Sequence, residues 1–143
     1  ENKCNSVTKN VGISKLKAKM DKAFSLFIRL RDTDDLGIGK CITCNKRVFW
    51  KEADAGHFIS RTYLGTRFDD RNVNLQCKGC NGFKNGEQYK HGVAINMLYG
   101  DDTADELWAI ARGSHKWDRA RYIETIAFYN SRVQSLREQK QVE

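Results

Sequence analysis

Four cysteines stand in two pairs near the middle of the chain, Cys41/Cys44 and Cys77/Cys80, and two residues separate the members of each pair. A short loop with this spacing presents two sulfurs on one side, and two such loops complete a tetrahedral zinc shell. Disulfides are the alternative, but no signal peptide or membrane-spanning apolar run is evident, and this spacing more often marks a metal site. The pattern predicts a structural zinc ion, and the fifth cysteine, Cys4, is expected to be a free thiol.

Three further polar residues, His57, Asn72 and Asn81, lie around the cysteine pairs at a spacing suited to phosphodiester hydrolysis. A nuclease of this kind needs a general base to activate water and a divalent cation, Mg²⁺ or Mn²⁺, near the scissile phosphate. A histidine with a reference pKa of about 6.5 can accept a proton at neutral pH. Asn72 is expected to tether the loop beneath His57, and Asn81 to offer an oxygen to the cation.

Each of these residues also has an ordinary structural explanation. A lone histidine between Gly56 and Phe58 is usually packed or at the surface, and asparagines in such segments usually serve turns or caps. Together, however, the three residues have the spacing from both cysteine pairs that a nuclease site requires, which favours the catalytic interpretation.

The basic composition is compatible with a nucleic-acid partner. The chain has 143 residues, 40% of them hydrophobic, which indicates one domain of ordinary size. Its formal net charge is +7. Each Lys or Arg near a phosphate releases condensed counterions, although an excess of charge also serves solubility. Lys84 is the best candidate contact, because it lies three residues after Asn81 on nearly the same helix face. The full set of candidate DNA contacts is Arg61, Arg67, Arg71, Lys78, Lys84 and Lys90.

Apolar periodicity predicts a helix near each end of the chain. Residues 14–32 repeat apolar side chains in steps of four and three, with Ser14 as the expected N-cap, and a last helix from about Asp118 repeats the same steps. The two seams either pack together within one chain or form a homodimer interface. They consist of Leu16, Met20, Ala23, Phe27 and Leu30, and of Tyr122, Ile126, Tyr129, Val133 and Leu136.

An α+β fold is expected, with a zinc-bound core at 37–90 between an N-terminal arm and helix (1–36) and a helical region (91–143). Segments 48–50 and 58–59 predict a hairpin, and a helix is expected to start at the second cysteine pair, which would make a treble-clef core. A helix over 88–98 is expected to end at Gly100, and Thr103 with Glu106 predicts a capping box for another that ends at Gly113.

The sequence resembles the phage lambda NinG family of recombination endonucleases, also called Rap. The resemblance covers nearly the whole chain and is carried by segments 23–32, 41–44, 54–58, 67–72 and 76–86. It implies a His-Asn-His-type, ββα-metal active site, binding of Holliday junctions and other branched DNA, and a dimer that cuts two strands. The expected setting is the host bacterial cytoplasm, without a membrane, with phage or host recombination proteins as candidate partners.

One position departs from related nucleases. Many His-Asn-His enzymes carry a metal-binding Asp immediately before the histidine, whereas this chain has Gly56. Asp54 is the first candidate for the missing oxygen, provided that a bulge at Ala55-Gly56 turns it toward the cation. Asp69 or Asp70 is an alternative, and a third is that Asn81 holds the ion together with phosphate oxygens and water.

The leading function is therefore a metal-dependent endonuclease that cuts branched DNA. Two other functions stay open: a zinc-stabilised DNA-binding module without catalysis, and a His-Asn-His nuclease that cuts linear duplex DNA.

Overall fold

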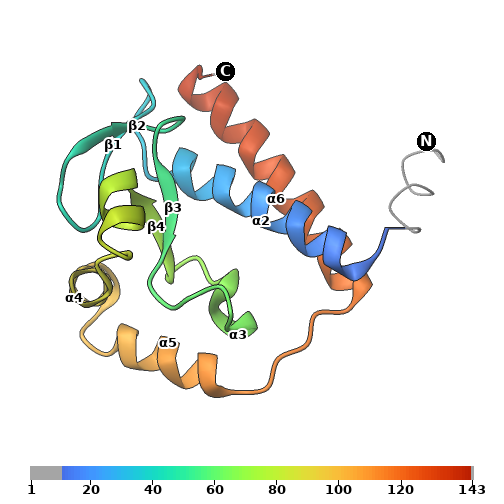
Figure 1. The fold of residues 1–143 in the computed structure, drawn as a ribbon. Coiled ribbons are helices and arrows are strands. Elements are labelled where there is room, and N and C mark those ends of the chain that lie inside the picture. The colour runs from blue at the N-terminus through green and yellow to red at the C-terminus, as the bar shows by residue number, and fades with distance from the viewer. Residues whose placement is uncertain (1–10, 143) are drawn as a thin grey trace.

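The computed structural model describes residues 11–142, in which helices surround two small antiparallel sheets (Figure 1). The expected α+β class is confirmed, and Cys4 lies outside the described residues. The helices are α2 (Ile13–Arg31), α3 (Leu64–Arg67), the π-helix η1 (Gly79–Phe83), α4 (Gln88–Tyr99), α5 (Thr103–Arg112) and α6 (Arg119–Lys140). The strands are β1 (Ile38–Lys40), β2 (Arg47–Phe49), β3 (Asp54–His57) and β4 (Val73–Gln76).

The two long helices α2 and α6 lie side by side and bury their apolar seams against each other (Figure 1). Leu16 and Met20 of α2 are buried, as are Tyr122 and Val133 of α6. Both helices predicted from periodicity are confirmed, and packing within one chain is the alternative that the structure shows. A homodimer would therefore need a different surface.

The strands pair differently from the predicted hairpin. β1 pairs with β2, and β3 pairs with β4, so segment 48–50 and segment 58–59 belong to separate parts of the fold. Phe58 instead follows β3, and its backbone N–H donates to the carbonyl oxygen of Asn72. The prediction was wrong because each true partner strand has only three or four residues, too few for alternation to reveal it.

A short π-helix, η1, begins within the second cysteine pair, where a helix was expected to start. Asn85, Gly86 and Glu87 have φ values of 50°, 84° and 48° and end that turn, because left-handed residues cannot continue a right-handed helix. The next helix, α4, begins only at Gln88. Asn81 therefore sits on a short, sharply ended turn.

Two predicted helix caps were wrong by a residue or two. α2 begins after Gly12, which places Ser14 inside the first turn. α5 begins at Thr103 with Asp102 as the cap residue, and the side chain of Glu106 pairs with Arg71 at 3.3 Å instead of reaching back. Helix ends are the least well determined feature of a sequence pattern.

The helices α4 and α5 pack on a second apolar cluster, which contains Phe58, Ile59, Ile95 and Leu107. The predicted helix over 88–98 is confirmed to within one residue, and Gly100, with a φ of 128°, follows it. None of the helices within residues 11–142 combines the length and hydrophobicity that crossing a membrane requires.

Candidate metal centre and catalytic cleft

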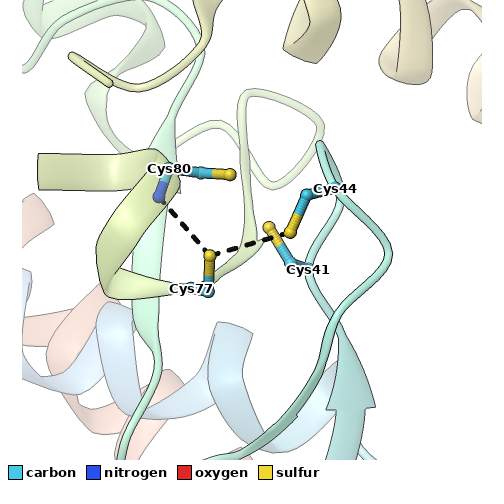
Figure 2. Close-up of side chains that lie close together, drawn as sticks. All are labelled: Cys41, Cys44, Cys77 and Cys80. Atoms are coloured by element: carbon cyan, nitrogen blue, oxygen red, sulfur yellow. Dashed lines mark hydrogen bonds between the residues drawn. The ribbon is translucent and has the colours of Figure 1, made fainter. Parts of the chain in front are cut away.

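The sulfur atoms of the four paired cysteines converge from the loop after β1 and from the start of the η1 turn (Figure 2). All four Sγ atoms lie within 4.8 Å of one another, and those of Cys44 and Cys77 are 3.8 Å apart. Four sulfurs bound at about 2.3 Å in tetrahedral geometry stand roughly 3.8 Å apart. The cluster therefore has the donor set and the spacing to hold a metal such as zinc.

Backbone hydrogen bonds shape each cysteine loop. In the first, Asn45 has a φ of 63°, and the N–H of Cys41 donates to the carbonyl oxygen of Lys46 at 2.8 Å. In the second, the N–H of Cys80 donates to Sγ of Cys77 at 3.4 Å. Burial alone would raise the pKa of Cys41, but hydrogen bonds from Thr43 and from backbone N–H groups lower it to about 6. At neutral pH this favours the thiolate form of Cys41, whereas the pKa values of Cys44 and Cys80 are raised within the cluster of thiols.

A polar cleft of about 420 Å³ lies between α2, β3 and the turn after η1. Asp54, His57 and Asn81, together with Arg61, line it, although they are up to 27 residues apart in sequence. Asn72 does not line the cleft. Of the four residues predicted to carry catalysis, the structure therefore brings three together in one place.

His57 is the last residue of β3, and its Nε2 lies 2.9 Å from the carbonyl oxygen of Arg67. A carbonyl oxygen can only accept, so Nε2 carries the proton and Nδ1 is the basic atom. Burial is the main influence on the pKa of His57 and lowers it below the ordinary value, against an opposing effect of the bond to Arg67. The imidazole is therefore neutral, and able to accept a proton, at neutral pH.

Asn72 is fully buried and ties the loop between β3 and β4 together. Its Oδ1 accepts from the N–H of Ile59 at 2.8 Å, and its Nδ2 donates to the carbonyl oxygens of Ile59 and Thr66, both at 3.0 Å. Thr66 directly precedes Arg67, whose carbonyl oxygen holds His57. Asn72 thus helps to position His57 indirectly, through the loop that carries the carbonyl oxygen of Arg67.

Asp54 and Asn81 lie next to each other in the lining of the cleft. Nδ2 of Asn81 donates to Oδ2 of Asp54 at 3.0 Å, which leaves the amide oxygen of Asn81 as an acceptor. Nζ of Lys78 lies 3.0 Å from Oδ1 of the same carboxylate. A carboxylate and an amide oxygen are hard donors of the kind that Mg²⁺ and Mn²⁺ prefer, although here the amide nitrogen of Asn81, and not its oxygen, faces Asp54.

The predicted bulge at Ala55-Gly56 was wrong, because β3 pairs with β4 without interruption from Asp54 to His57. Asp54 reaches the cleft as the first residue of its strand. The alternative ligands Asp69 and Asp70 do not line the cleft, and Asp69 is paired with Arg71 at 3.2 Å.

Packing against Gln76 explains why no acidic residue directly precedes His57. A Cβ atom at Gly56 would lie 2.0 Å from Oε1 of Gln76. Gln76 is buried, and its Nε2 donates to the hydroxyl of Thr43 at 3.1 Å and to the carbonyl oxygen of Gly86 at 2.8 Å. Any side chain at position 56 would therefore push on Gln76 and on the turn that carries Asn81.

Three of the six candidate DNA contacts are ion-paired within the protein. Nε of Arg67 donates to Asp21 at 2.9 Å, and Arg71 binds both Asp69 and Glu106. Lys78 pairs with Asp54, as described above. Each of these three side chains already has an acidic partner within the protein, which sequence proximity alone could not reveal.

The other three candidates, Arg61, Lys84 and Lys90, are exposed and make no ion pair within the part of the chain that the structure describes. Arg61 also lines the cleft. Of the six candidates, these three therefore carry a charge that is free to contact a phosphate.

Helix α2 contributes cleft residues that the sequence interpretation missed. Asp21, Phe24 and Ser25 line the cleft, and Asp21 binds Arg67 from 46 residues away in sequence. One signal was present: Asp21 is the sole acidic residue of an otherwise basic helix. An isolated acidic residue beside an apolar seam marks a position with a specific partner.

The fold and the site define an α+β protein with a four-cysteine cluster that could hold a metal ion, beside a histidine-containing polar cleft. The family model described as Bacteriophage Lambda NinG protein matches residues 6–140, and the chain belongs to this family.

Three similar proteins, each called Protein ninG, come from Escherichia phage 933W, Escherichia phage lambda and Salmonella phage P22. The first two are 30% identical over 117 residues, which is 81% of this chain and 55% and 54% of theirs. The P22 protein is 30% identical over 120 residues, 83% of this chain and 56% of its own. The chain therefore spans about half the length of these curated relatives. No solved structure shows a significant match.

Proposed function

We propose that this chain is a divalent-cation-dependent endonuclease of phage recombination that acts on branched DNA. One observation carries the proposal: His57, Asp54 and Asn81 line the same cleft beside the four-cysteine centre. A base and two hard oxygen donors are what phosphodiester hydrolysis requires. In this proposal β3, β4 and η1 serve as the two strands and the helix of a ββα-metal, His-Asn-His-type site, and zinc fills the four-cysteine centre.

His57 is the proposed general base. Its Nδ1 takes a proton from the attacking water, while the Nε2–H group stays bonded to the carbonyl oxygen of Arg67. The water oxygen forms a bond to phosphorus, the bond from phosphorus to the leaving oxygen breaks, and the leaving oxygen takes a proton from solvent. Because burial lowers the pKa of His57, the base is available throughout the neutral range.

Asp54 and Asn81 are the proposed ligands for Mg²⁺ or Mn²⁺. A cation bound there neutralises charge on the scissile phosphate and on the leaving oxygen. Lys78 now occupies one oxygen of Asp54, and its side chain is 66% exposed. It is therefore free to leave the carboxylate and turn toward a phosphate.

The proposed substrate is a Holliday junction or a related branched structure, and the proposed working unit is a homodimer in the host bacterial cytoplasm. Two opposed incisions require two active sites, whereas each chain has one His57 cleft. Since α2 and α6 cover each other's seams, the dimer is expected to use another surface. Phage or host recombination proteins are proposed partners.

The substrate is tested by incubating the purified chain with Mg²⁺ or Mn²⁺ and either a four-way junction or linear duplexes with the sequences of its arms. We expect paired cuts in the junction, while the linear arms stay intact. EDTA should abolish the cuts. Equal cutting of the arms would instead favour a general duplex nuclease. Binding without cutting by zinc-loaded protein would favour a non-catalytic DNA-binding module, in which Lys78 and not a metal cation occupies the carboxylate of Asp54.

The cation ligands are tested by substituting Asn81. The Asn81→Ala variant should need more Mg²⁺ for the same rate, because it loses an oxygen donor, and added Mg²⁺ should restore part of the activity. The Asn81→Asp variant keeps an oxygen at the same place and serves as the matched control. An unchanged Mg²⁺ dependence in Asn81→Ala would place the cation elsewhere.

A further inference from the structure

We propose that Phe83 stacks on a base at the branch point of the DNA substrate; this inference rests on the proposed function and extends it to substrate selection. The side chain of Phe83 is 93% exposed, more than any other large hydrophobic side chain within residues 11–142. Single exposed hydrophobic residues are common and need no explanation by themselves. The place of Phe83, its rigid support and its charged neighbours distinguish it.

Phe83 lies two residues after Asn81 on the η1 turn. Asn81 lines the cleft from this turn, while Phe83 projects into solvent. Side chains two residues apart on a helical turn point to different sides, so the ring of Phe83 lies outside the cleft, on another side of the turn that carries Asn81. A DNA strand whose phosphate enters the cleft meets this turn at Asn81, and the neighbouring nucleotides are the ones within reach of the ring.

The backbone that carries Phe83 is fixed to the four-cysteine centre. The N–H of Asn81 donates to the carbonyl oxygen of Cys77 at 3.0 Å, and the N–H of Gly86 donates to that of Cys80 at 2.8 Å. Gln76 holds Gly86 from the other side, through the 2.8 Å bond described above. A ring on a preorganised backbone loses little conformational freedom on binding, which favours stacking or insertion between bases.

Two exposed lysines follow Phe83 in the sequence. Lys84 directly follows Phe83, and Lys90 lies in the first turns of α4 beside Tyr89, which is 85% exposed. Neither lysine makes an ion pair among the residues described. Exposed aromatic rings next to lysines are the chemistry of a surface that stacks on bases while it contacts phosphates.

The ring is expected to distinguish branched from linear DNA. Bases inside a linear duplex are stacked on both faces, so a protein ring must break a base stack before it can insert. A base at a branch point lacks one regular neighbour and can accept the ring without that cost. Phe83 should therefore strengthen binding to a junction and leave binding to a linear arm unchanged.

The test compares Phe83→Ala with wild-type protein for binding to a fluorescently labelled four-way junction and to one linear arm. No divalent cation is added, so that cleavage does not interfere. The junction Kd of Phe83→Ala should rise about 5- to 150-fold, as removal of one stacking aromatic predicts, and the arm Kd should not change. Phe83→Trp should restore junction binding. Phe128→Ala, which removes a 58% exposed ring from α6, is the matched control and should change neither Kd.

A junction with 2-aminopurine at the branch point provides a second readout, because the fluorescence of this base depends on stacking. Wild-type protein should change the signal, and Phe83→Ala should not. Unchanged junction binding by Phe83→Ala, or equal weakening on junction and arm, would overturn the inference. Loss of self-association by this variant without a DNA effect would assign the ring to a protein interface instead. Binding is measured without cleavage, so a protein that fails to cut DNA would contradict the proposed function and leave this test intact.

Discussion

The helix pair α2–α6 and the cleft region are stabilised by different means. The helix pair buries a large apolar cluster, in which Phe24 and Phe27 contact the ring of Tyr129 with centroid distances of 5.1 and 4.9 Å. Among residues 11–142, Val48 is the partly buried hydrophobic side chain that packs against the cysteine cluster. Apolar burial is non-directional, whereas metal–ligand and hydrogen bonds fix positions. The cleft region, which holds the proposed catalytic groups, is the one built from directional interactions.

Buried polar side chains also distinguish the cleft region from the helix pair α2–α6. Asn72, Asn74, Gln76 and His91 are all buried around β4, where each binds backbone or a second side chain. A polar network of this kind specifies geometry at a cost in desolvation. Two of its atoms, Oε1 of Gln76 and Nδ1 of His91, have no partner among the described residues.

Removal of the proposed zinc should have the largest effect. Structural zinc contributes about 10 kcal/mol or more to small metal-dependent folds, so chelation or Cys41→Ser should unfold the cleft region while α2 and α6 retain more structure. Hydrogen exchange should show lost protection in β3, β4 and η1 first. Elemental analysis should find about one zinc per chain. Correctly folded protein, purified without chelators and free of zinc, would refute this expectation.

The helix pair should instead respond to loss of apolar volume. Leu16 is fully buried between the helices, so Leu16→Ala should lower the free energy of unfolding by about 2–5 kcal/mol in urea titrations. Leu36→Ala is the control, because Leu36 is 76% exposed and should cost little. Equal effects of the two substitutions would contradict the packing described for α2 and α6.

Acid should destabilise the polar region through His91. Burial lowers the pKa of His91 to about 4, whereas the unfolded chain titrates near the ordinary value of about 6.5. Between these values the unfolded state binds a proton that the folded state does not, so stability falls as pH drops, by about 3 kcal/mol in all. Urea titrations from pH 7 to 4.5 check this, with zinc content followed in parallel. His91→Gln removes the titrating group and should flatten the profile; an equally steep profile in this variant would assign the effect to other groups.

A smaller effect is expected at Gly56. Gly56→Ala forces a Cβ against Gln76, and overpacking of this kind costs about 1–3 kcal/mol. Cleavage should fall as well, since Gln76 also holds the turn after η1. Gly82→Ala adds a methyl group in open space and should be well tolerated. A fully active and stable Gly56→Ala protein would show that Gln76 adjusts freely.

Local patterns predicted much of this molecule. The spacing of the cysteines and the apolar repeats of the two end helices are properties of neighbouring residues, and the structure shows both features. His57 and Asn81 were chosen from their position relative to the cysteine pairs, and Asp54 as the carboxylate nearest to His57, and the three share one cleft.

Long-range partners were beyond the sequence patterns. β1 and β4 are too short to be recognised by alternation, and their pairing decides which loops meet. Arg67 was expected to contact DNA, but it forms an ion pair with Asp21 on α2. Gly56 was expected to mark a bulge, whereas it makes room for Gln76. Each of these outcomes depends on a contact across the fold rather than on local spacing.

The central claim is that the His57 cleft hydrolyses DNA, and the rate of junction cleavage by His57→Ala tests it most directly. Single-turnover rates are compared with wild type in Mg²⁺ at pH 7.5, with zinc content and junction binding as controls for folding. The rate should fall by about 10²- to 10⁴-fold while zinc and binding are retained, and the wild-type rate should decline only below about pH 6.5, because burial lowers the pKa of His57. Cleavage by His57→Ala at the wild-type rate would place the active site elsewhere.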